Sequence, residues 1–202
     1  MKVLIIGGSG KIGKFLKNSN KNYFFTYYKN RIANGIKFDL CNDNVSLLIK
    51  KFNINKIILL SAISDPDECF KYKKKSYSIN VKYTKNLISK LKNKDVHLIF
   101  ISTEFVYSGN KGNYSEKSNT DPINLYGKQK LLVENYIKKN ITNYSILRIA
   151  KTYGDNIHIK GLLTDFLNLI KKGQRNFFGA YDQIFNPLYV NDLKKIIQFF
   201  LK

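Results

Sequence analysis

The stretch GGSGKIGK, residues 7–14, follows the apolar run KVLII and carries the strongest structural signal in the sequence. Its glycines match G-x-x-G-x-x-G, the spacing of a turn that joins a buried strand to a helix and binds dinucleotide phosphates. In this interpretation Gly7 permits the tight turn, Gly10 lets the backbone approach the pyrophosphate, and Gly13 lets the helix pack closely on the sheet. The sequence therefore predicts a dinucleotide site, with an ordinary glycine-rich turn as the alternative.

The same stretch also matches the start of a P-loop, which would bind a nucleoside triphosphate. From Gly8 it fits G-x-x-x-x-G-K, but a P-loop needs Ser or Thr after its Lys, because that hydroxyl ligates Mg²⁺. Phe15 occupies this position and cannot ligate a metal ion. A P-loop also leaves Gly7 and Gly10 without a role, so the dinucleotide interpretation is favoured.

Apolar β-rich runs alternate with amphipathic helical patterns along the chain. Strands are expected at Lys2–Ile6, Tyr23–Tyr28, Ile36–Asp39, Lys56–Leu60, His97–Ser102 and Tyr144–Arg148. Helices are expected at Lys11–Asn18, Val45–Phe52, Ser76–Leu91, Leu125–Lys139, Leu162–Lys172 and from Asp192 to Lys202. This alternation predicts an α/β fold with a Rossmann-type doubly wound parallel sheet, which binds ligands at the carboxyl ends of its strands.

We expect residues 1–202 to form a single NAD(P)-binding Rossmann domain, in which residues 154–202 contribute a small, reduced substrate-binding portion. The last helical pattern, LKKIIQFFLK, has one apolar face. That face is expected either to pack on the main domain or to require a further C-terminal segment.

Composition argues against several other classes of protein. Hydrophobic residues make up 44% of the chain, and no apolar run approaches the roughly 20 residues that span a bilayer. Without a signal-peptide pattern, we expect a cytoplasmic protein. Cys41 and Cys69 are too few for a disulfide scaffold and lack metal-ligand spacing, so we expect free thiols and no metal site. The acidic residues at 65, 67 and 68 are interpreted as a helix N-terminus.

The net charge raises the question of nucleic-acid binding. Lys plus Arg minus Asp plus Glu is 35 − 14 = +21. The excess is mostly Lys, spread along the chain and accompanied by Asn, Ile, Phe and Tyr, which share A/T-rich codons. The densest basic run, Lys71–Lys75, is interpreted as a solvated helix face. We therefore expect no specific nucleic-acid partner, although a basic surface attracts anionic sugar nucleotides.

Tyr126 and Lys130 are candidate catalytic residues, because they are i and i+4 on a predicted helix and share one face. A phenol has an ordinary pKa near 10, and a neighbouring ammonium stabilises the phenolate and so lowers that pKa. Thr103, directly after the fifth predicted strand, offers a hydroxyl that can polarise a substrate carbonyl. Tyr107 and Lys111 have the same spacing, but the turn sequence SGN separates them.

The second predicted strand informs the choice of cofactor. An NAD site usually has Asp or Glu at the end of this strand to bind the ribose 2′-hydroxyl. Here the sequence is FFTYYKNR, which offers Lys29 and Arg31 and no acid. Basic residues suit a 2′-phosphate, so NADPH is favoured over NADH, with the general Lys excess as the alternative explanation.

Taken together, these segments resemble an extended short-chain dehydrogenase/reductase, and within it the dTDP-4-dehydrorhamnose reductase group. The resemblance covers nearly the whole chain, in the order GGSGKIG, SAISDPDEC, INVKYTKNL, STEFVYSG, YGKQK, RIAKTYG and DQIFNPLYVNDL. It implies that Thr103, Tyr126 and Lys130 form a catalytic triad. Tyr126 would protonate the keto oxygen of the sugar as the nicotinamide delivers hydride, and Lys130 would hold the nicotinamide ribose. Asn80 matches a position that often supports the Lys through water.

The resemblance, together with the glycine turn and the second strand, implies one set of cofactor-binding residues. These are Gly7, Gly10, Lys11, Ile12, Gly13, Lys29, Arg31, Asp39, Leu40, Ala62, Tyr126 and Lys130. In this set Asp39 lies where the family contacts the adenine, and Ala62 lies where the backbone passes the cofactor.

The implied function is NADPH-dependent reduction of a nucleotide-linked 4-keto-6-deoxysugar, with dTDP-4-dehydrorhamnose favoured as substrate. Two departures bear on the sugar: Glu104 stands where the group usually has Asp, and SAISDPDEC lacks the group's commoner A-V-D-K core. A sugar-nucleotide epimerase or dehydratase and a non-catalytic regulatory NAD(P)-binding subunit are the alternatives. A homodimer and a Mg²⁺ requirement are both left open.

Overall fold

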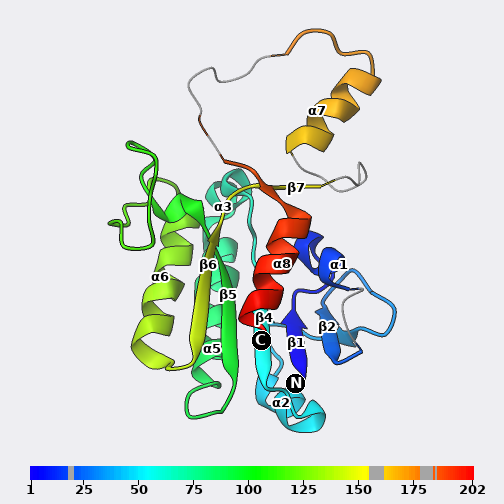
Figure 1. Ribbon diagram of the computed structural model, residues 1–202, viewed down its shortest axis with the longest axis vertical. Helices are drawn as coiled ribbons and strands as arrows, with labels where there is room; N and C mark the ends of the chain where they lie inside the picture. Colours follow the sequence, from blue (N-terminus) through cyan, green and yellow to red (C-terminus); the bar gives the residue numbers. More distant parts are fainter. Residues whose placement is uncertain (18–20, 155–161, 178–183, 185) are drawn as a thin grey trace. The chain divides into compact units, whose positions relative to one another are not determined.

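The structure is a computed structural model that describes residues 1–17, 21–154, 162–177, 184 and 186–202 (Figure 1). The chain divides into two compact units, residues 1–148 and residues 149–202. The described part contains no helix long and apolar enough to cross a membrane.

A six-stranded sheet forms the first unit, in the order β3-β2-β1-β4-β5-β6. The strands are β1 Val3–Ile6, β2 Tyr23–Tyr27, β3 Ile36–Lys37, β4 Lys56–Leu59, β5 His97–Thr103 and β6 Tyr144–Ile149. All six lie where the sequence predicts them, and the parallel Rossmann-type fold is confirmed. The order reverses between β1 and β4, and a doubly wound sheet binds its ligand at this switch point.

The helices that follow these strands are mostly those predicted. They are α1 Lys11–Leu16, α2 Val45–Phe52, α3 Pro66–Lys71, α4 Lys73–Tyr77, the π-helix η1 Ser78–Tyr83, α5 Thr84–Ser89, the 3₁₀ helix η2 Glu104–Val106 and α6 Leu125–Asn140. Helix α1 is shorter than expected, and Asn18 lies outside the described residues. The acidic cluster is confirmed as a helix N-terminus, since the Asp65 carboxylate accepts the backbone N–H groups of Asp67 and Glu68.

The predicted single helix at Ser76–Leu91 differs from the structure in two respects. The helical region begins earlier, at Lys73, and a π segment interrupts it between α4 and α5. A π turn inserts an extra residue into the helix and changes which side chains face inward. In this protein the π segment carries Asn80, whose side chain is buried and faces the loop after β4.

The main core lies between one face of the sheet and three helices. Strand residues Leu4, Ile57, Leu98 and Phe100 meet Val45 of α2, Leu87 and Ile88 of α5, and Val133 and Ile137 of α6. The alternate strand residues Val3, Ile5, Ile58 and Ile99 are also fully buried. Burial on both faces explains why these strands are continuous apolar runs instead of alternating patterns.

The second unit contains a small parallel pair of strands, β7 Thr152–Tyr153 and β8 Leu188–Tyr189, which the sequence did not predict. Its helices are α7 Leu162–Lys171 and α8 Val190–Phe200. Both helices match predictions to within two residues, α8 beginning before the expected Asp192. That residues 154–202 contribute to substrate binding stays a prediction.

Candidate functional site

The glycine stretch forms a tight turn between β1 and α1, at the switch point of the sheet. Gly7 has a φ of +88°, and its carbonyl accepts the backbone N–H of Gly10 at 3.0 Å. A Cβ on Gly7 would lie 2.7 Å from the backbone nitrogen of Ser61, which follows β4. Only glycine fits both the positive φ and this close approach. The turn therefore packs closely against the segment that follows the carboxyl end of β4.

Gly13 also has a backbone neighbour, although not the one expected. A Cβ there would lie 2.3 Å from the carbonyl oxygen of Gly8, so the close contact is between α1 and its own turn. Gly10 is the N-cap of α1 and makes no side-chain cap. Lys11 and Ile12 form the first turn of this helix, and both are half-buried.

Asn80 holds the loop that follows β4. Its side-chain oxygen accepts the backbone N–H of Ile63 at 2.8 Å, and its amide nitrogen donates to the Ile63 carbonyl at 2.9 Å. The same nitrogen donates to the side-chain oxygen of Gln129 on α6 at 2.7 Å. The resemblance implied support of Lys130 through water, whereas the direct contacts of Asn80 fix the segment that contains Ala62.

Tyr126 and Lys130 share one buried face of α6, as their spacing predicts. Their exposed fractions are 7% and 3%, and the Lys130 Nζ atom lies 5.9 Å from the centroid of the Tyr126 ring. The Lys130 Nζ atom donates a hydrogen bond of 2.6 Å to the carbonyl of Ile101 on β5 and lies 4.3 Å from the Phe100 ring centroid. Asn124 is the N-cap of this helix, and its side-chain oxygen accepts the backbone N–H of Gly127.

Thr103 ends β5 and caps the short helix η2. It is buried, and its hydroxyl accepts the backbone N–H of Phe105 at 3.3 Å. A Cβ on Gly127 would lie 2.1 Å from the Phe105 carbonyl oxygen, and the Phe105 ring meets the Tyr126 ring edge-on at 6.4 Å. Residues on both sides of Thr103, Ser102 and Phe105, therefore contact α6, the helix that carries Tyr126 and Lys130.

Burial dominates the electrostatics of this pair. It lowers the pKa of Lys130 to about 7, against the opposing effects of Glu134 and Cys69. Burial, followed by the influence of Cys69, raises the pKa of Tyr126 above its ordinary value. The helical spacing predicted that the Lys130 ammonium would lower the pKa of the phenol, whereas burial of Tyr126 raises that pKa.

The sequence did not predict a role for Glu134, a buried carboxylate on the same helix as Tyr126 and Lys130. Glu134 has an exposed fraction of 0% and accepts a hydrogen bond of 2.5 Å from the hydroxyl of Ser102. The guanidinium of Arg148 donates to both of its oxygens, at 2.6 to 3.2 Å. The available signal was spacing, since Glu134 follows Lys130 by one helical turn and so lies on the same face.

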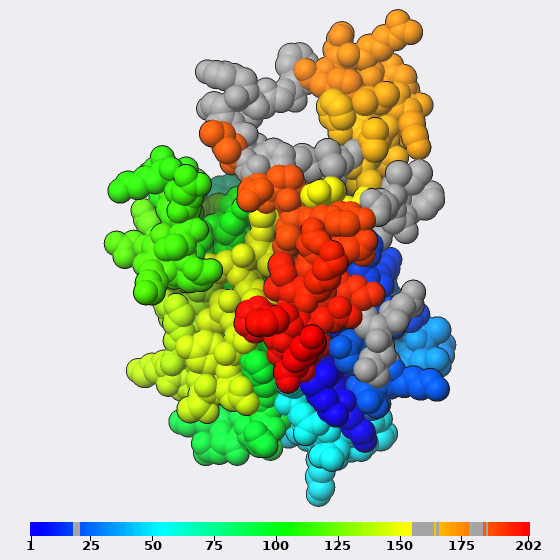
Figure 2. All heavy atoms as spheres, viewed as in Figure 1, coloured from blue at the N-terminus to red at the C-terminus, as the bar shows by residue number. Residues whose placement is uncertain are grey.

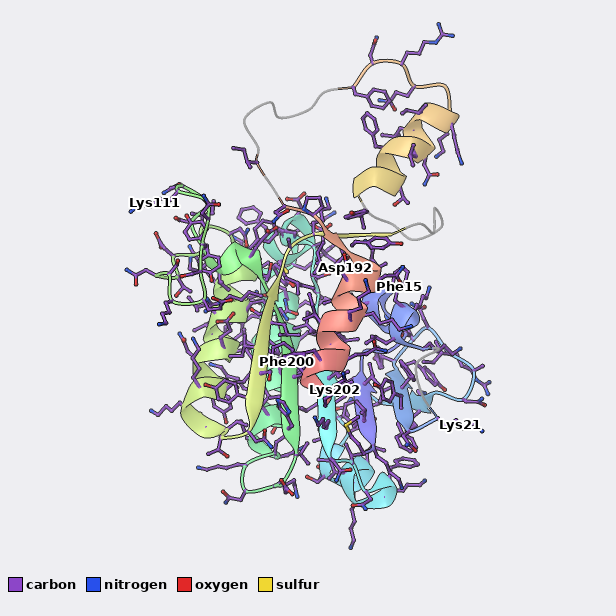
Figure 3. The ribbon with its side chains drawn as sticks, in the orientation of Figure 1. Phe15, Lys21, Lys111, Asp192, Phe200 and Lys202 are labelled. Carbon is purple, nitrogen blue, oxygen red and sulfur yellow. The ribbon has the colours of Figure 1, made fainter. Side chains whose placement is uncertain are left out.

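Arg148 also reaches the loop between η2 and α6. Its Nη1 atom donates to the hydroxyl of Tyr107 at 2.7 Å, and that hydroxyl donates to the carbonyl of Ser115 at 2.8 Å. The Tyr107 ring stacks on Tyr114 with centroids 4.6 Å apart. Figure 2 shows this loop as a projecting lobe (bright green) beside α6, and Figure 3 shows Lys111 pointing outward from it.

The residues expected near the adenosine part of the cofactor lie beyond β2 and β3. Lys29 and Arg31 are exposed after β2. The Asp39 carboxylate accepts hydrogen bonds from the backbone N–H of Cys41 at 2.9 Å and from the side-chain amide of Asn42 at 2.8 Å, and the first of these chiefly lowers its pKa. Leu40 packs against the main core. The sequence predicted Asp39 as the last residue of this strand, whereas β3 ends at Lys37 and Asp39 lies two residues beyond it.

Within the described ranges, no group of three His, Cys, Asp or Glu side chains is arranged to hold a metal ion. Cys41 and Cys69 are free thiols. The Cys69 thiol is buried and donates to the carbonyl of Ile63, the residue that Asn80 also holds.

Comparison with known proteins follows the same lines. Residues 1–202 match the family described as RmlD substrate binding domain. The methionine adenosyltransferase 2 subunit beta of Danio rerio is 25% identical over 201 residues, which cover 96% of this chain and 62% of the relative. The ADP-L-glycero-D-manno-heptose-6-epimerase of Brachyspira hyodysenteriae is 26% identical, with 99% and 72% covered. The chain thus spans less than two thirds of the Danio rerio relative.

Two similar solved structures are described as reductases. A hypothetical dTDP-4-dehydrorhamnose reductase from Sulfolobus tokodaii has a TM-score of 0.86 and 29% identity, with 100% of this chain and 72% of that chain covered. The dTDP-4-dehydrorhamnose reductase from Bacillus anthracis, in complex with NADP, has a TM-score of 0.83 and 27% identity, with 98% and 70% covered.

Proposed function

We propose, from the premise that this chain belongs to the RmlD substrate binding domain family, that it is an NADPH-dependent reductase of a nucleotide-linked 4-keto-6-deoxysugar. The observation that carries the proposal is the buried Tyr126–Lys130 pair at the carboxyl edge of a Rossmann-type sheet. The favoured reaction converts dTDP-4-dehydrorhamnose to dTDP-rhamnose, because solved structures similar to this chain are described as reductases of that sugar.

The glycine turn fits a dinucleotide. Its N-cap, Gly10, brings no side chain to the start of α1, where a phosphate group is favoured by the helix dipole and backbone N–H groups. The residues that would hold NADPH are those of the turn, Gly7 to Gly13, with Ala62 beside them and Lys130 at the nicotinamide ribose. Asp39 and Leu40 would contact the adenine, while Lys29 and Arg31 would bind the 2′-phosphate.

Tyr126 is suited to donate a proton. Because burial raises its pKa, the phenol is protonated at neutral pH and can protonate the keto oxygen of the sugar. The bound nicotinamide supplies the hydride. The hydroxyl of Thr103 would orient the same oxygen, and a protonated Lys130 would stabilise the phenolate that Tyr126 leaves behind.

The test is NADPH oxidation by the purified chain given dTDP-4-dehydrorhamnose, beside a Tyr126→Phe control. Turnover is expected, and the control should lose about 10²- to 10⁴-fold in kcat while it still binds NADPH. Turnover that survives in Tyr126→Phe would show that another group donates the proton. NADPH binding without turnover on any 4-keto sugar would exclude the reductase.

A second candidate is a non-catalytic regulatory subunit that binds NADP(H). The observation that favours it is the similarity to methionine adenosyltransferase 2 subunit beta, which covers nearly all of this chain. This chain has Thr103, Tyr126 and Lys130 together, which favours the enzyme over the regulatory subunit. An epimerase would keep its cofactor tightly bound and recycle it, so copurified NAD would distinguish that alternative.

A further inference from the structure

Glu134 connects three segments of the candidate site: helix α6 and strands β5 and β6. It is one helical turn after Lys130 on α6, it accepts the Ser102 hydroxyl one residue before Thr103 on β5, and it pairs with Arg148 on β6. All of these contacts lie in the first unit, residues 1–148. A fully buried carboxylate with this many donors is held in one position, so its charge acts on its neighbours from a fixed point.

The contacts and charges around Lys130 come from its own helix, from α3 and from β5. Its own helix supplies Tyr126 and Glu134, and α3 supplies the Cys69 thiol. Strand β5 supplies only uncharged groups, the Ile101 carbonyl and the Phe100 ring. Glu134 is therefore the nearby carboxylate that can offset the cost of burying an ammonium here.

Arg148 opposes this effect through the same carboxylate. Its guanidinium donates three hydrogen bonds to Glu134 and so neutralises much of the charge that Lys130 would otherwise feel. Hydrogen bonding to Glu134 raises the pKa of Arg148, which keeps the guanidinium charged throughout the working pH range. The surface lysine Lys138 is also 4.0 Å from Glu134, but its side chain is 48% exposed and solvent screens it.

We propose that Glu134 and Arg148 are positioning residues that set the charge of Lys130 in opposite directions, Glu134 favouring the protonated amine and Arg148 the neutral one. Burial lowers the pKa of Lys130 to about 7 and Glu134 opposes that shift, so a change in either residue of the pair is expected to alter the charge of Lys130 near neutral pH. The significance for catalysis rests on the proposed function, because a charged Lys130 is what would stabilise the Tyr126 phenolate. The charge of Lys130 itself depends on no cofactor or substrate.

The test follows the Lys130 amine directly, by NMR titration of the ligand-free protein labelled with ¹³C at the lysine ε-carbons. The Lys130 signal is identified as the one lost in Lys130→Met. Glu134→Gln leaves Arg148 unopposed, and the titration midpoint should fall by about one pKa unit or more. Arg148→Gln should raise it by a similar amount, which keeps the proposal testable if Glu134→Gln does not fold.

Two further variants separate charge from structure. The double variant Glu134→Gln/Arg148→Gln removes both charges of the ion pair, so neither partner of that pair is left uncompensated, and it should return the midpoint close to that of the natural protein. Lys138→Gln, the control on the exposed side of Glu134, should leave it unchanged. The proposal would be overturned if the Lys130 midpoints of Glu134→Gln and Arg148→Gln both equal that of Lys138→Gln. It would also be overturned if the two midpoints shift in the same direction. Absence of reductase activity with shifted midpoints would instead count against the proposed function alone.

Discussion

The side-chain amide of Asn80 pairs with the backbone of Ile63 as a second peptide group would, accepting its N–H at 2.8 Å and donating to its C=O at 2.9 Å. This pairing joins the π segment η1 to the loop after β4. The further hydrogen bond from Asn80 to Gln129 joins both to helix α6. The loop beside the glycine turn and the helix that carries Tyr126 are therefore held by one buried amide.

Replacing Asn80 with Leu should destabilise the fold and loosen this loop. The variant leaves the Ile63 N–H and the side-chain oxygen of Gln129 without their partner, whereas the Ile63 carbonyl keeps the Cys69 thiol. Each unpaired buried group costs about 1–3 kcal/mol. We expect the free energy of unfolding in urea to fall by about 2–4 kcal/mol. Asn140→Ala, which removes a half-buried contact to the Tyr136 carbonyl, is the control and should cost about 1 kcal/mol or less. Equal losses in the two variants would contradict the special role of Asn80.

Substitution by Ala should have different effects at Gly10 and at Gly13: the first should weaken NADPH binding, and the second should destabilise the fold. At Gly10 the added Cβ meets only the Gly7 carbonyl, at 3.2 Å, in an extended conformation that Ala adopts easily. We expect Gly10→Ala to fold normally and to bind NADPH at least tenfold more weakly in a fluorescence titration, about 1.4 kcal/mol. Normal NADPH affinity in Gly10→Ala would argue against a phosphate at this turn.

Gly13→Ala tests the fold instead of the ligand. Its Cβ would overlap the backbone of Gly8, so α1 must move away from the turn. Overpacking of this kind costs about 1–3 kcal/mol, and a lower Tm in the absence of NADPH is the expected result. A Tm equal to that of Gly10→Ala would show that α1 adjusts without cost.

Replacing Lys130 with Met should change the pH dependence of stability. Burial lowers the pKa of Lys130 from its ordinary 10.5 to about 7, so between these pH values the unfolded chain binds a proton that the folded chain lacks. Stability of the natural protein therefore rises with pH through this window, and the cost of burying the ammonium is fully present below pH 7. Lys130→Met should gain more in Tm relative to the natural protein at pH 6 than at pH 9. In the control Lys128→Met, which replaces an exposed neighbour, the difference in Tm from the natural protein should be the same at both pH values.

Lys29 and Arg31 should determine which nicotinamide cofactor binds. Charge-assisted hydrogen bonds to a 2′-phosphate contribute about 1.5–3 kcal/mol, so Lys29→Ala and Arg31→Ala should each raise the Kd for NADPH about tenfold or more. The Kd for NADH should not change, because it has no phosphate at that position. Lys37→Ala, an exposed lysine on β3, provides the control for net charge. Equal weakening of both cofactors would point to general electrostatic attraction.

The sequence predicted the elements whose signals are local. The six strands follow from apolar runs, and the pairing of Tyr126 with Lys130 follows from helical spacing. The role of the π segment could not be predicted, because its Asn80 contacts Ile63, a residue that lies 17 positions away and meets it only in the folded chain. The same holds for Glu134 of α6, which meets Arg148 on β6. The predicted direction of the Tyr126 pKa shift was wrong, because the sequence shows the spacing of Tyr126 and Lys130 but not the burial of Tyr126.

The contact of Gly127 with the Phe105 carbonyl has a consequence for engineering this chain. A Cβ at position 127 would lie 2.1 Å from this backbone oxygen, so either the start of α6, which carries Tyr126, or the segment at Phe105 would have to shift. A library that varies substrate preference should therefore keep this position invariant. It can diversify the neighbouring loop between η2 and α6, where a Cβ at Gly109 or Gly112 meets no atom within 4 Å. Both of those glycines have positive φ, so Asn is the natural first substitution to try.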